Sequence, residues 1–208
     1  GLSYPSIVAS GTNATTLHYM KNDDPIAKGE MMLMDFGIRW MTMHADITRS
    51  FPVSGKFNPM QKMLYEIVLK GQREVEKVAR AGVTIDELNN VCWAVINDGL
   101  EKKFVAAGGK YELRYKDRPH GVSHLMGEQE HDGDPFRNYL KQPMMPGWMI
   151  SNEPGLYGEF KIRLDGKTYD ETIGIRIEDN LVMTQKGCMN LSNIIPKSVR
   201  AIEKLMKG

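Results

Sequence analysis

The sequence lacks a long hydrophobic run, has few cysteines and carries almost no net charge. None of its apolar segments approaches the roughly 18 residues that a membrane-spanning helix needs, so we expect no membrane association. Two cysteines, Cys92 and Cys188, are too few for a disulfide framework and indicate a reduced, cytoplasmic setting; no signal peptide is visible. With 27 basic and 26 acidic residues and a formal net charge of +1, the chain gives no reason to expect a nucleic-acid partner.

The hydrophobic pattern of the 208 residues is that of one sizeable α+β domain. Short apolar, partly β-branched segments predict strands over residues 6–10, 31–37, 45–53, 148–153 and 172–184. Helical spacing of apolar residues predicts helices over residues 58–80, 84 to about 104, and 196–207. Thr84 and Glu87 form a capping-box pattern at the start of the second helix. Because strands and helices are grouped rather than alternating, the order favours an α+β domain over a doubly wound sheet.

A short pattern occurs twice in the sequence. Residues 29–35 and 147–153 each begin with glycine, continue as a strand-like run and end in an acid. Each is followed by a strand-like segment with a basic-x-acid pattern, at residues 44–46 and 176–178. Two similar halves of this kind would bring four carboxylates together from four strands. A repeat this short also arises by coincidence, so by itself it leaves both interpretations open.

Four acids stand at the ends of these strand-like segments or inside them: Asp35, Asp46, Glu153 and Glu178. A carboxylate that is removed from water must be paired, protonated or bound to a metal. For any single acid, pairing with a neighbouring base is the simpler interpretation, and Arg39, Arg49 and Arg176 are available. Four acids in two matched halves weaken that interpretation.

Three of the five histidines, His120, His124 and His131, lie in one polar stretch. A lone histidine is more often a structural group than a ligand, but a histidine cluster beside four acids on strands favours a metal or acid–base site. Oxygen-rich ligation with one imidazole suits Mn²⁺, Co²⁺, Zn²⁺ or Fe²⁺. Four carboxylates and one histidine supply enough oxygens to bridge two such ions roughly 3–4 Å apart.

These residues belong to an ordered series of motifs that resembles the pita-bread metallopeptidases, and among them aminopeptidase P (Xaa-Pro aminopeptidase). The series extends over nearly the whole chain. In chain order it comprises Ile7-Val8-Ala9-Ser10-Gly11-x-Asn13-Ala14, Leu17-His18-Tyr19, Asp35-Phe36-Gly37, Ala45-Asp46-Ile47-Thr48-Arg49-Ser50-Phe51-Pro52-Val53, His120-Gly121-x-Ser123-His124, His131-Asp132, Glu153-Pro154-Gly155-Leu156-Tyr157, Gly174-Ile175-Arg176-Ile177-Glu178-Asp179 and Asn190-Leu191-Ser192.

The resemblance implies a pita-bread fold, in which two pseudo-symmetric halves form a curved, mostly antiparallel sheet covered by helices. Residues 1–208 would be its catalytic domain, without the first helices and the N-terminal domain that family members usually carry. The implied activity is hydrolysis of the peptide bond between an N-terminal residue and a following proline by a metal-bridging hydroxide. We therefore expect a peptide substrate with proline in second position, a homo-oligomer, and two divalent ions, Mn²⁺ first, with Co²⁺, Zn²⁺ or Fe²⁺ as alternatives.

The resemblance also implies a set of metal ligands. Asp35 and Asp46 match the aspartates that chelate one ion, with Asp46 bridging to the second. His124 and Glu153 match ligands of the second ion, and Glu178 matches the other bridge. Glu153 also matches the carboxylate proposed to move a proton from the nucleophilic water.

Further residues match groups on the substrate side of the family's site. His18 and His131 resemble histidines that hold the substrate and stabilise the oxyanion, and His120 resembles a third histidine on that side. Arg176 matches an arginine near the proline subsite, and Tyr157 matches a tyrosine that lines the same region.

The chain departs from the family pattern at two further places. Glu128-Gln129-Glu130 stands before His131, where the family often has aliphatic residues near the substrate. Residues 158–173 form a longer, basic link, which we interpret as a solvated hairpin. Two other functions stay open from the sequence: a prolidase acting only on Xaa-Pro dipeptides, and a pita-bread binding module without catalysis.

Overall fold

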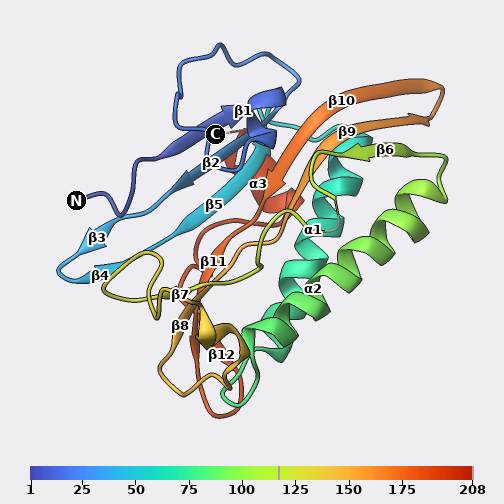
Figure 1. Ribbon diagram of the computed structural model, residues 1–208. Coiled ribbons are helices and arrows are strands. Elements are labelled where there is room, and N and C mark those ends of the chain that lie inside the picture. Colours follow the sequence, from blue (N-terminus) through green and yellow to red (C-terminus); the bar gives the residue numbers. More distant parts are fainter. Residues whose placement is uncertain (117, 208) are drawn as a thin grey trace.

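Antiparallel sheets make up the β structure of the computed structural model, which describes residues 1–116 and 118–207 (Figure 1). The strands are β1 (Ile7–Ser10), β2 (Met31–Phe36), β3 (Arg39–Trp40), β4 (Met43–His44), β5 (Ile47–Pro52), β6 (Lys110–Leu113), β7 (Leu125–Met126), β8 (Met149–Asn152), β9 (Gly155–Leu164), β10 (Lys167–Arg176), β11 (Asp179–Met183) and β12 (Cys188–Asn190). They form sheets of order β1-β2-β5, β10-β9-β6, β12-β11-β8-β7 and β3-β4. The strand pairings among the described residues are all antiparallel, which confirms the α+β class.

The three predicted helices are present. They are α1 (Pro59–Val78), α2 (Ile85–Gly99) and α3 (Val199–Leu205), with short helical turns η1 (Gly11–Thr15), η2 (Leu100–Val105) and η3 (Asn138–Lys141). The second predicted helix contains both α2 and η2, because the backbone continues without a break into a π-helical turn. In the described ranges no helix is long and apolar enough to cross a bilayer.

The predicted strand over residues 172–184 is two strands, β10 and β11. The chain changes partners at the break between them: Ile177 N–H donates to Pro154 O at 3.2 Å, and Glu178 N–H donates to Thr48 O at 3.0 Å. At this step the chain leaves the β9–β10 hairpin and contacts the beginning of β5. The link over residues 158–173 is part of that hairpin, and its outer end is exposed, as predicted.

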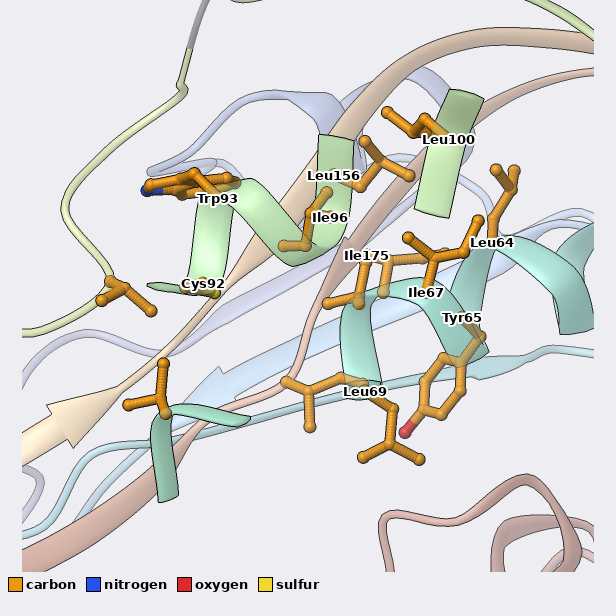
Figure 2. Close-up of a cluster of buried hydrophobic side chains, with 14 of the residues drawn as sticks. Leu64, Tyr65, Ile67, Leu69, Cys92, Trp93, Ile96, Leu100, Leu156 and Ile175 are labelled. Atoms are coloured by element: carbon orange, nitrogen blue, oxygen red, sulfur yellow. The ribbon is translucent and has the colours of Figure 1, made fainter. Parts of the chain in front are cut away.

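The main hydrophobic core lies between α1, α2 and the β9–β10 hairpin. Figure 2 shows side chains from the two helices facing Leu156 of β9 and Ile175 of β10. The side chains labelled there are Leu64, Tyr65, Ile67 and Leu69 of α1, Cys92, Trp93 and Ile96 of α2, and Leu100 of η2. Burying one large apolar side chain contributes roughly 1.5–3 kcal/mol. The core therefore anchors the inner end of the hairpin, from which β10 leads to Arg176 and Glu178.

The repeated sequence pattern corresponds to two strand pairs of the same kind. β2 pairs with β5, and β8 pairs with β11, both antiparallel. Asp35 lies in β2 opposite Thr48, while Glu153 directly follows β8. Asp46 and Glu178 each directly precede the second strand of their pair. The two halves thus present their acids from equivalent positions.

The two halves approach closely at Gly174 of β10. A Cβ at this glycine would lie 1.9 Å from the carbonyl oxygen of Ala14 in η1. Backbone cannot yield to that overlap, so only glycine lets β10 lie against η1. The contact places the Arg176 end of β10 beside the β1-β2-β5 sheet.

The capping box of α2 is formed as predicted and gives a stability prediction. Glu87 N–H donates to Thr84 Oγ1 at 3.1 Å, and Thr84 N–H donates to Glu87 Oε2 at 2.7 Å. Thr84→Ala removes the capping oxygen and should lower the free energy of unfolding by about 1 kcal/mol, measured by urea denaturation. Thr84→Ser keeps the oxygen and serves as the control. Equal stability of the alanine and serine variants would contradict the assignment.

Candidate metal centre

The four predicted acids and His124 converge at the floor of one cleft. Ligand atoms of Asp46, His124 and Glu178 all lie within 4.8 Å of one another. Glu153 joins them through His124, whose Nε2 is 3.4 Å from Glu153 Oε1 and 3.5 Å from Asp46 Oδ2. Asp35 joins them from the neighbouring strand β2. The structure therefore brings together every residue that the sequence predicted as a metal ligand.

His124 presents one ring nitrogen to the carboxylates because the other is engaged by the backbone. Its Nδ1 lies 3.1 Å from Leu125 O, which can only accept, so Nδ1 carries a proton and Nε2 faces Asp46 and Glu153. Burial would lower the pKa of His124, but the Asp46 and Glu153 carboxylates outweigh it and raise the pKa to about 9. Burial opposes ionisation of Asp46, yet its contacts with His124 and Tyr4 hold its pKa below the usual value. The two carboxylates thus favour a positive charge at Nε2, which is either a proton or a cation bound there.

Glu178 is the most deeply enclosed of the acids. Its side chain is 1 % exposed, and its Oε2 accepts a hydrogen bond from Thr48 Oγ1 at 2.7 Å. Its Oε1 is buried and has no hydrogen-bond partner among the described residues. Burial and the charges of Asp46, Glu153 and Asp35 raise the pKa of Glu178 well above its ordinary value. A buried carboxylate oxygen without a hydrogen bond is a group that a bound cation would satisfy.

Pairing with a neighbouring base was the simpler interpretation of the four acids, and it holds for one of them: Arg176 pairs with Asp35. Its Nη2 lies 2.5 Å from Asp35 Oδ2, and its Nε donates to Thr48 Oγ1 at 3.1 Å. Arg49 instead pairs with Asp179, and Arg39 is exposed at the surface. Pairing with a base therefore accounts for Asp35 and leaves Asp46, Glu153 and Glu178 without a guanidinium or ammonium partner among the described ion pairs.

Tyr4 belongs to the centre, although no pattern in the sequence indicated it. Its hydroxyl lies 2.6 Å from Asp35 Oδ1 and also contacts Asp46 Oδ1, so its single proton can go to either carboxylate. Burial, together with the charges of Asp35 and Asp46, raises the pKa of Tyr4, which keeps the phenol protonated. Tyr4 stands before β1 and offers neither strand alternation nor a ligand motif, so only the three-dimensional contact reveals it.

Four of the five predicted substrate-side residues, His18, His120, His131 and Arg176, line the same cleft, which has a volume of about 480 Å³. His18 and His131 are exposed in its wall, and the His131 ring packs edge-on against the His124 ring at 4.3 Å between centroids. His120 also lines the cleft. Tyr157 is buried behind His120 and does not line it. The structure thus places three histidines in the wall of the cleft and Tyr157 one layer deeper.

Tyr157 connects Arg176 to His120. Arg176 Nη1 donates to Tyr157 Oη at 3.2 Å, and Tyr157 Oη lies 3.1 Å from His120 Nε2. His120 Nδ1 lies 2.8 Å from Gly121 O, so it donates there and Nε2 accepts the tyrosine proton. Burial lowers the pKa of His120, in agreement with a neutral ring. His120 therefore enters the cleft with a fixed orientation.

The donor set fits divalent cations. Four carboxylates face one buried guanidinium and one imidazole, so negative charge is in excess. Carboxylate oxygens with a single imidazole are suitable ligands for Mn²⁺, Co²⁺, Zn²⁺ or Fe²⁺. The unpaired Glu178 oxygen and His124 Nε2, which faces the Asp46 and Glu153 carboxylates, are donors of this kind. A carboxylate-rich centre at the base of a cleft is the arrangement of a metal-dependent hydrolase.

Comparison with known proteins agrees with this class. The profile of Metallopeptidase family M24 matches residues 1–185, and the chain belongs to this family. It is 35% identical over 212 residues to the Xaa-Pro aminopeptidase of Haemophilus influenzae, covering 98% of this chain and 48% of that protein. It is 32% identical over 207 residues to the mitochondrial intermediate cleaving peptidase 55 of Arabidopsis thaliana, covering 100% of this chain and 41% of that protein.

A solved structure confirms the predicted pita-bread fold. Zinc-substituted aminopeptidase P of Escherichia coli, in complex with product, superposes with a TM-score of 0.83 at 32% identity. The match covers 99% of this chain and 48% of that one. The chain thus spans about half the length of the relatives it matches.

Proposed function

We propose that this chain is the catalytic domain of a metal-dependent aminopeptidase that removes an N-terminal residue preceding proline. The observation that carries the proposal is the buried triad of Asp46, His124 and Glu178, with one Glu178 oxygen left unpaired. Membership of family M24 and similarity to a Xaa-Pro aminopeptidase support the choice of substrate.

The five predicted ligands would hold two divalent ions, with Mn²⁺ as our first expectation. When bound, such ions polarise a peptide carbonyl and make water a nucleophile near neutral pH. Glu153 is less buried than the other ligand acids and accepts a hydrogen bond from Ser151 Oγ at 3.1 Å. Its lower burial supports Glu153 as the acid that takes a proton from water and passes it to the leaving amine.

The histidines of the cleft wall act on the peptide itself. Neutral His120 is fixed by Tyr157 and Gly121 and can contact the substrate without bringing charge. His18 and His131 can donate hydrogen bonds to a carbonyl oxygen as negative charge develops on it. Tyr157 and Arg176 serve the site by orienting His120 and by neutralising Asp35.

A chelation experiment tests the proposal. We expect the Mn²⁺-loaded protein to release the first residue from a tripeptide with proline in second position, to lose that activity on chelation and to regain it on adding Mn²⁺. The same tripeptide with alanine in place of proline is the control for specificity. Cleavage of the alanine peptide but not the proline peptide would contradict the proline assignment, and cleavage of neither would favour a binding module.

Arg137 gives a specific reason to examine the prolidase alternative in the same assay. It lines the cleft, and a guanidinium there would suit the terminal carboxylate of a very short substrate. A Xaa-Pro dipeptide and the tripeptide sharing its first two residues separate the two activities. A prolidase would cut the dipeptide alone, whereas we expect the tripeptide to be cut.

A further inference from the structure

The cleft contains a fifth acid that the metal centre does not use. Glu130 lines the cleft together with the four ligand carboxylates. No hydrogen bond to its carboxylate occurs among the described residues, and the one basic group within 4 Å of it there is His131, whose Nε2 lies 3.8 Å from Glu130 Oε1. An acid that faces a substrate cleft without a firm partner is available to a ligand.

The position of Glu130 is fixed by a closed loop over residues 127–133. Asp132 Oδ2 accepts from Glu128 N–H at 3.1 Å, and Gly127 N–H donates to Gln129 O at 3.1 Å. The loop is also attached to the neighbouring hairpin, because His44 N–H donates to Gly127 O at 3.1 Å. These contacts fix the loop that carries Glu130 at the cleft, while its carboxylate itself accepts no hydrogen bond from the described residues.

The surroundings of Glu130 favour a positive partner. Its side chain is 27% exposed, and burial, followed by the charge of Asp46, raises its pKa to about 7. His131 lies beside Glu130 at 3.8 Å, too far for a hydrogen bond between the two side chains. Among the described ion pairs, Arg176 is engaged by Asp35, and none joins Arg137 to Glu130.

The remaining cleft wall suits the hydrocarbon part of a basic side chain. Pro5, Ile7, Leu17 and Met20 line the same cavity as Glu130. Lysine and arginine bury their methylene groups against apolar surface while their charged ends reach a polar partner. An apolar wall that shares a cleft with a partly buried carboxylate is a binding site of that character.

We propose that Glu130 is a specificity-determining residue that binds the basic side chain of a substrate whose first residue is lysine or arginine. This rests on the proposed function, in which the second residue is proline, so that the side chain of the first residue is free to vary. The α-amino group is common to all such substrates and cannot by itself create a preference among them.

The test compares tripeptides that differ only in their first residue: lysine, arginine or norleucine, each followed by proline and alanine. Norleucine matches the lysine stem without its charge. We expect Glu130→Gln to reduce the lysine-to-norleucine ratio of kcat/KM by about tenfold, mainly through KM, as for loss of a partly exposed charge-assisted hydrogen bond. Glu128→Gln, on the same loop but exposed and outside the cleft, is the matched control and should leave the ratio unchanged.

Glu130→Lys should reverse the preference for the first residue of the substrate. A purely structural role for Glu130 cannot produce such a reversal. This variant should prefer a first-residue glutamate over lysine. Equal losses for all first residues, or an unchanged ratio in Glu130→Gln, would overturn the proposal. If the wild type cuts none of the proline peptides, the proposed function fails instead. Calorimetric binding of the lysine and norleucine peptides to the same variants then decides the role of Glu130 separately.

Discussion

Glu178→Gln is expected to abolish tight metal binding while leaving the metal-free protein as stable as the wild type or more so. The raised pKa of Glu178 favours the protonated side chain in the metal-free fold, whereas the unfolded chain ionises it at neutral pH. Folding without metal therefore requires proton uptake, a cost that glutamine does not have. Glutamine also keeps the shape and an oxygen that can accept from Thr48.

The same substitution should remove activity, because it removes a charged ligand oxygen from the centre. Metal affinity should fall by more than the roughly 10- to 100-fold typical of losing an outer partner of a ligand, since here the ligand itself is lost. Calorimetric titration with Mn²⁺ measures the affinity, and urea unfolding with and without Mn²⁺ measures the stability. Without Mn²⁺, the free energy of unfolding of the variant should equal or exceed that of the wild type. With Mn²⁺, the variant should be the less stable of the two.

Glu159→Gln on β9 is the matched control, because Glu159 is exposed and lies outside the site. It should change neither the affinity for Mn²⁺ nor the stabilisation that Mn²⁺ gives. If Glu178→Gln bound Mn²⁺ as tightly as this control, Glu178 would not be a ligand. Destabilisation of the metal-free Glu178→Gln protein would instead indicate a structural role for the ionised carboxylate.

The acids of the centre could be predicted from the sequence because each interrupts an apolar strand-like pattern, where an unpaired charge is costly. The strand pairs β2–β5 and β8–β11 turned that local signal into a shared site. The sequence did not reveal the short β3–β4 hairpin or β12, because two or three residues are too few for a recognisable alternation.

Tyr4 and the partner of Arg49 could not be predicted for a different reason. Tyr4 contacts Asp35 and Asp46 across long separations in the chain, and nothing local encodes that meeting. Arg49 was available to any of the acids, yet it pairs with Asp179, the residue after Glu178. Successive residues in extended backbone point to opposite faces, so Glu178 faces the cleft while Asp179 faces the far side.

Asp179 is the centre of a buried polar network on that far side. Its carboxylate lies 2.6 Å from Arg49 Nη2, accepts from Gln72 Nε2 at 2.7 Å and Asn190 Nδ2 at 2.9 Å, and pairs with Lys197. The side chain of Asp179 is fully buried. Burial would raise its pKa, but the charges of Arg49 and Lys197 outweigh this and lower the pKa to about 2.

Asp179→Asn should therefore be the most destabilising of the substitutions considered, lowering the free energy of unfolding at pH 7 by about 3 kcal/mol, because it leaves Arg49 and Lys197 buried without their shared counter-charge. Glu76→Gln is the matched control: Glu76 also contacts Lys197, at 3.1 Å, but is 31% exposed, so its loss should cost less than about 1 kcal/mol. Urea unfolding measures both, and equal midpoints for Asp179→Asn and the wild type would refute the assignment.

The pH dependence gives an independent check with a definite sign. A carboxyl group whose pKa is lower in the folded state, about 2 against 3.8, stabilises the fold above pH 4 and loses that contribution as pH falls toward 2. The wild type should lose about 2 kcal/mol from this group over that interval, and Asp179→Asn should lack this loss.

Arg49 also donates to the backbone carbonyls of Thr48 and Glu178. The network thus fixes the backbone of Glu178 and that of Thr48, whose hydroxyl donates to Glu178. Asp179→Asn should therefore weaken Mn²⁺ binding, although Asp179 itself faces away from the cleft.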